Sequence, residues 1–430
     1  MTVRQRERGA SLWRDRRFRS FWAGQTISEL GARISELALP LIAVVALGAS
    51  ANQVAWLTAL EWLPNLLAFG LGAWIDYRVH KRRLLVVADV VRAALLLTVP
   101  AAYVLGAVTL GQLYAVAVLT GAAGVLFNTA YPPFFAHLVP RASYVDANSK
   151  LSVSRSVSYV AGPALGGFLV QALSAPIAVA ADAFSFICSA FMIGRVRVEE
   201  PPPPIGNDDG SPSLLRQAGD GLRFVVGDPI LRASLGCATT INFFTFISAT
   251  GLTVLFASRQ LGLSPSVIGL AFGIGATGAL LGAVAAPKVS RLIGIGRSVV
   301  VGAVLFPAPI AIAAFAAGPT WLRGSALGSA EFLSGMGVMF FDVNLNSLQT
   351  ATVPDGLRSR VAGAFSTINY GIRPLGAIVG GMLATTFGLR VALLVAAIGG
   401  TLSVLWLLPS PIPAIRSLEE YEARDAAGHD

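Results

Sequence analysis

The sequence Phe127-Asn128, followed by Val139-Pro140 and Tyr159-x3-Pro163, recurs in the second half of the chain at nearly the same spacing. Its counterpart there is Phe341-Asp342, Val353-Pro354 and Tyr370-x3-Pro374. The two halves also begin alike, since Asp15-x3-Arg19-x4-Gly24 matches Asp228-x3-Arg232-x3-Gly236. A repeat of this length predicts two equivalent structural units in one chain.

The composition places these units in a membrane. Of 430 residues, 54% are hydrophobic and 13% are charged, and the mean hydropathy is +0.68. Soluble domains carry roughly 25% charged residues. The basic residues behind the net charge of +9 sit in short loops, so we expect a lipid bilayer and no nucleic acid as partner. A hydrophobic chain of two equivalent halves is typical of secondary transporters.

The hydropathy pattern predicts an all-α membrane protein with twelve transmembrane helices in two pseudo-symmetric six-helix halves, because apolar runs exceed the roughly 18 residues that a span requires. We expect these helices near residues 20–47, 53–75, 84–106, 111–135, 149–173, 176–194, 230–257, 264–286, 298–317, 320–349, 360–386 and 389–408.

The distribution of arginine and lysine predicts the orientation. Basic residues are concentrated before the first predicted helix and in the loops after the second, eighth and tenth. The loops at 48–52 and 107–111, on the other side, carry no charge. Because cytoplasmic loops carry the excess of Lys and Arg, both termini are predicted to be cytoplasmic.

The chain divides into four parts on this interpretation. Residues 1–194 form the N-terminal half, 195–229 a cytoplasmic linker, 230–410 the C-terminal half and 411–430 a cytoplasmic tail. The linker contains apolar residues on one face of a helix between Ser213 and Val226. That helix either lies at the membrane interface or packs on the ends of the bundle.

Ionisable residues inside the predicted spans are candidates for function, because each costs roughly 2.5–3.5 kcal/mol on insertion scales. Glu29, Arg33 and Glu36 share one face of the first helix. We expect this stripe to face a central cavity, with Glu29 or Glu36 exchanging a proton and Arg33 tuning it. The alternative is a Glu-Arg-Glu ladder that neutralises itself.

The second half carries different charges. Its counterpart of Glu29 is Asn242, and its own mid-membrane charges are Glu331 and Arg373. These two either pair with each other or serve substrate and proton. In the first half, Asp89 and Arg92 fall on one helix face, which favours a local structural pair.

The loop after the second helix contains Gly72, Asp76, Arg78, Arg82 and Arg83. It resembles the gating signature of the major facilitator superfamily, although Tyr77 stands where that signature has an Arg directly after the Asp. The resemblance implies a contact between charged groups that breaks when the transporter changes state. The alternative is a plain basic loop that only sets topology.

The fifth predicted helix contains Gly162, Pro163, Gly166 and Gly167, which resembles the motif of the antiporter branch of that superfamily. Small residues at this spacing allow close helix contact, and proline permits a bend. Ordinary small-residue packing is the alternative interpretation.

The whole chain between residues 12 and 408 resembles the bacterial drug:proton antiporter group of macrolide and enterobactin exporters. The N-terminal residues Phe18-Arg19-Ser20-Phe21-Trp22-Ala23-Gly24-Gln25 carry this likeness. It implies a monomeric transporter in the bacterial cytoplasmic (inner) membrane that exports a small amphiphilic compound in exchange for protons. Alternatives are an importer or lysophospholipid flippase on the same fold, or a membrane sensor that does not transport.

The sequence has no metal-ligand spacing and no arrangement of a nucleophile with a base. We therefore expect no enzymatic activity, no cofactor and no bound metal.

Overall fold

The computed structural model describes residues 12–67, 80–140, 143–198, 214–354 and 357–417, and these residues form helices with no strand. The α-helices are α1 (Arg16–Leu41), α2 (Ala51–Trp62), α4 (Lys81–Val104), α5 (Leu110–Leu138), α6 (Tyr144–Ala172), α7 (Ala175–Gly194), α8 (Leu214–Gly227), α9 (Pro229–Ile247), α10 (Thr250–Arg259), α11 (Pro265–Ile293), α12 (Ile295–Leu305), α13 (Ile310–Ala314), α14 (Thr320–Thr352), α15 (Arg358–Gly371), α16 (Arg373–Thr386) and α17 (Leu389–Thr401). A π-helical turn, η3 (Ile42–Ala46), extends α1, and the short 3₁₀ helices are η2 (Leu12–Arg14), η4 (Leu63–Leu67), η7 (Leu402–Trp406) and η8 (Ile412–Ala414).

Each predicted span falls on helix wherever the structure describes it, but several are interrupted. The seventh is broken between α9 and α10, the ninth between α12 and α13, and the eleventh between α15 and α16. Pro307 and Pro309 lie in the second of these breaks, where a proline cannot supply the helical N–H. In the described ranges, eight helical segments are long and apolar enough to cross a membrane.

The repeated residues mark the ends of helices. Asp15 caps α1 and Asp228 caps α9, each accepting hydrogen bonds from backbone N–H groups of the first turn. Val139 and Val353 occupy the C-cap positions of α5 and α14 in extended conformation, and a proline follows each of them. The duplicated pattern therefore encodes where corresponding helices begin and end.

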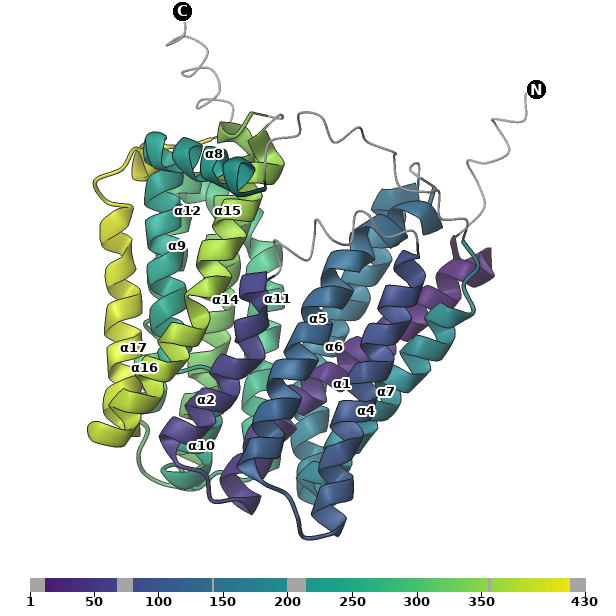
Figure 1. The fold of residues 1–430 in the computed structure, drawn as a ribbon. Coiled ribbons are helices and arrows are strands. Elements are labelled where there is room, and N and C mark those ends of the chain that lie inside the picture. The colour runs from purple at the N-terminus through teal and green to yellow at the C-terminus, as the bar shows by residue number, and fades with distance from the viewer. Residues whose placement is uncertain (1–11, 68–79, 141–142, 199–213, 355–356, 418–430) are drawn as a thin grey trace, which may run out of the picture.

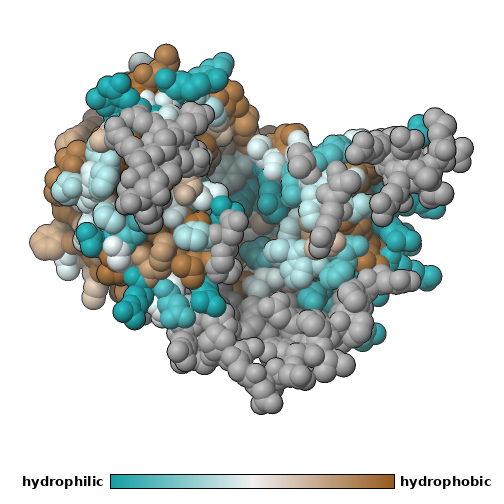
Figure 2. Space-filling view, turned by 90° about the horizontal axis from the view of Figure 1, so that it is seen from above, coloured by the Kyte–Doolittle hydropathy of each residue, from teal (hydrophilic) through white to brown (hydrophobic). Residues whose placement is uncertain are grey.

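The helices form two groups, with α1 and α4 to α7 in one and most of α9 to α17 in the other (Figure 1). The groups meet where α6 contacts α11, α2 contacts α16, and α10 contacts both α1 and α2. Seen from the end that carries α8, the space between the groups is hollowed (Figure 2).

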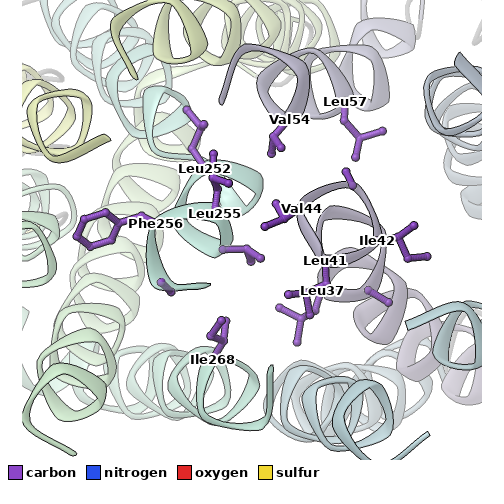
Figure 3. Packing of buried hydrophobic residues seen from close by; sticks show 14 of the residues in the cluster. Leu37, Leu41, Ile42, Val44, Val54, Leu57, Leu252, Leu255, Phe256 and Ile268 are labelled. Carbon is purple, nitrogen blue, oxygen red and sulfur yellow. The ribbon is translucent and has the colours of Figure 1, made fainter. Parts of the chain in front are cut away.

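The end opposite α8 is closed by a buried apolar cluster drawn from both groups (Figure 3). Val44, which follows α1, and Val54 of α2 face Leu252 and Leu255 of α10. The Arg259 guanidinium adds a hydrogen bond to the Val44 carbonyl across the same junction at 3.4 Å. At the α8 end the buried clusters instead remain within one group each, so the molecule is sealed at one end and hollow at the other.

The helix α8 lies across the end of the second group (Figure 1). Its Asp220 forms an ion pair with Arg360 of α15 at 3.6 Å, and a Cβ on Gly221 would meet the Arg360 backbone. Val225 is fully buried against this group, whereas Leu222 and Val226 are exposed. The described part of α8 thus packs on the bundle end and also presents apolar side chains outward.

The closed end should depend on Phe256, which is fully buried. We expect Phe256→Ala to destabilise the protein by about 3–5 kcal/mol, because the substitution opens a cavity in the buried cluster behind α10. Thermal unfolding of the purified protein in detergent measures this loss. Phe315→Ala is the matched control, since Phe315 is 70% exposed; equal melting temperatures for the two variants would contradict the assignment.

Candidate functional site

The acidic and basic stripe of α1 forms a network with α6. Arg33 Nη1 donates to Glu36 Oε2 at 2.6 Å, and Arg33 Nη2 lies 3.9 Å from Glu29 Oε2. Arg155 of α6 approaches Glu29 at 3.8 Å, and the Arg33 guanidinium lies over the Tyr159 ring at 5.0 Å. The ladder that the sequence predicts is therefore present, but α6 supplies a second cation and an aromatic ring.

Small residues on α6 bring the two helices together. A Cβ on Gly162 would collide with the side chain of Arg33, and one on Gly166 would lie 3.2 Å from Ile34 Cα. Gly167 faces the second group instead, where its added Cβ would lie 3.0 Å from Gly269 Cα of α11. The glycines around Pro163 thus place α6 between the α1 stripe and α11.

A cavity of about 490 Å³, which we call the central cavity, lies between α1 and α6 on one side and α11 and α14 on the other. Arg33, Glu36, Arg155, Tyr159 and Glu331 supply most of its polar groups. Its remaining walls are largely apolar, with Leu37, Pro163, Phe272, Ala276, Leu280, Phe306, Val338 and Met339 among the lining residues.

Glu331 enters the central cavity from α14. Gly275 of α11 leaves room for it, because a Cβ there would lie 2.9 Å from the Glu331 Cβ. Within the described ranges no ion pair is made by this carboxylate. Glu331 is therefore an acid facing a mostly apolar cavity without a fixed counter-ion.

A second cavity, the side cavity, has a volume of about 410 Å³. Its lining comes from α1, α2, α4, α5 and α7 together with Tyr370 and Arg373 of the second group. Glu61, Arg92 and Asp182 are among its charged residues. Arg33 and Glu36 line both cavities, so the α1 stripe is the wall that the cavities share.

Arg373 does not pair with Glu331. Its Nε donates to Asn242 Oδ1 at 2.8 Å, and its guanidinium lies over the rings of Trp62, Phe246 and Tyr370 at 4.3, 4.8 and 4.5 Å. The sequence leaves open whether Glu331 and Arg373 pair with each other or serve substrate and proton. The first alternative is wrong, because the two side chains line different cavities. Cations over aromatic faces are stabilised by the ring quadrupole, and Asp342 of α14 adds an electrostatic interaction with Arg373 without a direct ion pair among the described residues.

The loop motif is described only at its end. Gly72, Asp76 and Arg78 lie outside the described residues. Arg82 Nη1 donates to the Val196 carbonyl at 2.7 Å, which ties the start of α4 to the end of α7, and Arg83 is exposed. The gating role of this loop stays a prediction.

Sequence reasoning missed Asp182 of α7, which is buried and lines the side cavity. The available signal was a single acid within the apolar segment 176–194. Sequence reasoning also missed that Arg155 and Tyr159 of α6 face the α1 stripe. The sequence of α6 alone does not indicate which of its faces packs against α1. Among the described residues, no group of three or more His, Cys, Asp or Glu side chains could hold a metal ion.

Two groups of apolar helices around a hollow, with ionisable side chains inside it, define a multi-pass membrane protein of the transporter type. Residues 21–377 match the Major Facilitator Superfamily, and the chain belongs to that family.

Relatives in this family include transporters and drug efflux pumps. The chain is 27% identical over 390 residues to the uncharacterized MFS-type transporter YfiS of Bacillus subtilis. The aligned residues cover 87% of this chain and 88% of YfiS. It is 26% identical over 368 residues to the multidrug efflux pump Tap of Mycolicibacterium fortuitum, covering 83% and 86% of the two chains.

Solved structures share the fold at low sequence identity. A point mutant of the nucleoside transporter NupG superposes with a TM-score of 0.72 at 12% identity, covering 92% of this chain and 99% of that one. A bacterial homologue of the iron transporter ferroportin in its inward-facing state gives a TM-score of 0.71 at 17% identity, covering 93% and 100%.

The hydrogen bond between Arg373 and Asn242 should contribute to stability. We expect Asn242→Ala to cost about 1.5–3 kcal/mol, because hydrogen bonds to charged groups are worth that much. Thermal unfolding in detergent measures it, with Asn148→Ala as control because Asn148 is exposed. A melting temperature for Asn242→Ala equal to that of the control would show that the bond adds nothing.

Proposed function

We propose that this chain is a secondary transporter of the bacterial cytoplasmic (inner) membrane that exports a small amphiphilic compound in exchange for protons. The observation that carries the proposal is the shared wall: Arg33 and Glu36 line both the central cavity and the side cavity. Relatives named as multidrug efflux pumps support the direction of transport.

The proposed topology has twelve spans, with α8 and both termini on the cytoplasmic side. Residues 1–194 and 230–410 would form the two halves, joined by a linker at 195–229 and followed by a cytoplasmic tail at 411–430. Basic residues at the starts of α4 and α15, among them Arg82 and Arg360, support it, because cytoplasmic loops carry the excess of Lys and Arg. The ion pair of Arg360 with Asp220 joins the start of α15 to α8. On this topology the hollow opens to the cytoplasm and the apolar cluster seals the outer side, as in an inward-facing state.

The central cavity is where we place the substrate. Its volume lies within the roughly 300–1,000 Å³ of small-molecule sites, which are commonly apolar with a few polar groups. Glu331 offers a carboxylate without a fixed counter-ion, so a substrate with an apolar body and a positive group fits these walls.

Proton exchange would act through competition for Arg33. Arg33 contacts both Glu29 and Glu36, and protonation of either acid removes one of its two partners. The guanidinium would then shift toward the acid that stays ionised, changing the shared wall between the cavities. Binding and proton transfer are thus coupled through one side chain.

Inverted membrane vesicles test this function directly. With an acidified lumen, adding ethidium should raise the lumenal pH, because dye enters as protons leave. Ethidium uptake without proton movement would instead indicate uncoupled transport. Absence of both dye and proton movement for ethidium, a macrolide and a neutral amphiphile would count against an exporter and favour a membrane sensor.

Glu29 and Glu36 should differ from exposed acids in this assay. We expect Glu29→Gln and Glu36→Gln each to abolish proton movement while retaining dye binding, because each removes one partner of Arg33. The control is Asp146→Asn at the exposed start of α6, where Asp146 pairs with Lys150. Wild-type proton movement in both glutamine variants would refute coupling through Arg33.

Glu331 should determine the preference for cations. We expect Glu331→Gln to weaken ethidium binding about 10- to 100-fold, since a charge-assisted contact is worth about 1.5–3 kcal/mol. Binding of a neutral amphiphile should change little. Fluorescence titration of the purified protein with both compounds measures this, and equal losses for the two would exclude a charge contact.

A further inference from the structure

A second group of charged side chains lies behind the α1 stripe, where α4 packs against α7. It consists of Asp89 and Arg92 on α4 and Asp182 on α7, and we call it the buried triad. Asp89 is 0% and Asp182 is 1% exposed, in helices that face the first half's own interior. The transport scheme above makes no use of these residues.

The triad contains more acid than its surroundings satisfy. Both carboxylate oxygens of Asp89 are buried and, in the part of the chain that the structure describes, make no hydrogen bond of normal geometry; the neighbouring Ser189 hydroxyl of α7 is buried and likewise makes none. The ion-pair contact of Asp89 is to Arg92 Nη1 at 3.8 Å, longer than a hydrogen bond. Asp182 accepts from Ser185 Oγ at 3.1 Å. An unpartnered buried carboxylate is costly in its charged form and far less so when protonated.

The surrounding helices are shaped for these side chains. A Cβ on Gly124 of α5 would lie 2.6 Å from Arg92 Nη2, and one on Gly31 of α1 would collide with Asp182 and Ser185. The Arg92 guanidinium also lies over the rings of Phe127 and Phe186 at 5.5 and 5.1 Å. These contacts from α5 and α7 hold the Arg92 guanidinium near Asp89, and it lines the side cavity together with Asp182.

The charges around the triad can be counted from each packed helix. Arg92 is the cation that acts on both Asp89 and Asp182. Asp182 is the sole charged residue of α7, and α5 carries no Asp, Glu, Lys or Arg. From α1 the charge that acts on Arg92 is Glu29, another acid. Two carboxylates therefore share one guanidinium, and full ionisation would leave a net negative charge in the interior.

We propose that the buried triad binds one exchangeable proton, which Asp89 and Asp182 share, and that it is a second protonation site distinct from the α1 stripe. One carboxylate pairs with Arg92 while the other is the protonated acid. On release, the acid becomes a carboxylate and its proton passes to the side cavity.

The side cavity gives the triad a route for this proton. Arg92, Asp182 and Ser35 line that cavity, as do Glu36 and Glu61. Asp182 also lies against α1 through Gly31, so a change in its charge is felt by the helix that carries Arg33. Only this link to transport rests on the function proposed above; proton binding by the triad does not.

Infrared spectroscopy of the full-length protein in lipid vesicles, without substrate, tests the proposal. A protonated aspartic acid shows a carbonyl stretch that the carboxylate lacks, and carbon-13 labelling of aspartate separates this band from glutamate. At pH 7 the wild type should show the band, which should disappear reversibly as the pH rises.

Three variants should change the intensity of this infrared band, two by decreasing it and one by increasing it. Asp89→Asn and Asp182→Asn should each lose the band, because the remaining acid then pairs with Arg92 and ionises. Arg92→Gln should increase it, because neither acid retains a cation. Asparagine is close in size and charge to the protonated acid, so both variants should be tolerated. If one of them does not fold, the other alone tests the prediction.

Asp220→Asn is the matched control, since Asp220 forms a partly exposed ion pair on α8. Its spectrum should equal that of the wild type. Absence of the band in the wild type at pH 7, or its persistence in the Asp89 and Asp182 variants, would overturn the proposal. Loss of transport alone, with these spectra as expected, would leave the triad in place and refute only the coupling scheme.

Discussion

The interactions of Arg33 connect the parts of this molecule. Its guanidinium pairs with Glu29 and Glu36, lies over Tyr159 and contributes to both cavities. A lone arginine inside a membrane is expensive, and partners within the protein offset that cost. The position of α6 follows from the same requirement, because Gly162 lets it approach close enough for Arg155 and Tyr159 to complete the network.

The second half solves the same problem with different chemistry. Asn242 occupies the place that corresponds to Glu29, and it accepts a hydrogen bond from Arg373. Three aromatic rings surround that guanidinium in place of carboxylates. Arg33 in the first half therefore lies in direct contact with acids that can take up protons, whereas the direct contacts of Arg373 are to an amide and to aromatic rings. This difference is why we propose that proton exchange takes place in the first half.

Much of the architecture could be predicted from the sequence, because hydrophobic runs and cap residues act locally. Asp15 and Asp228 are corresponding residues ahead of the first and seventh predicted spans, and in the structure each caps a helix. The breaks near Ser248 and Pro307 were missed, since a membrane helix with a proline can be continuous or interrupted. Partners between helices were also missed, because the face that α6 turns to α1 depends on packing across the whole bundle. Asp182 was visible in the sequence, yet its role requires Arg92 on another helix.

The contact between Gly167 and Gly269 has a mechanical consequence. At this point α6 and α11 touch backbone to backbone, and an added Cβ on either glycine would lie within 3.0 Å of the other's Cα. Side chains that interlock must disengage before two helices can turn past each other, whereas bare backbones need not. We therefore expect α6 and α11 to turn past each other at this crossing without side chains having to disengage there.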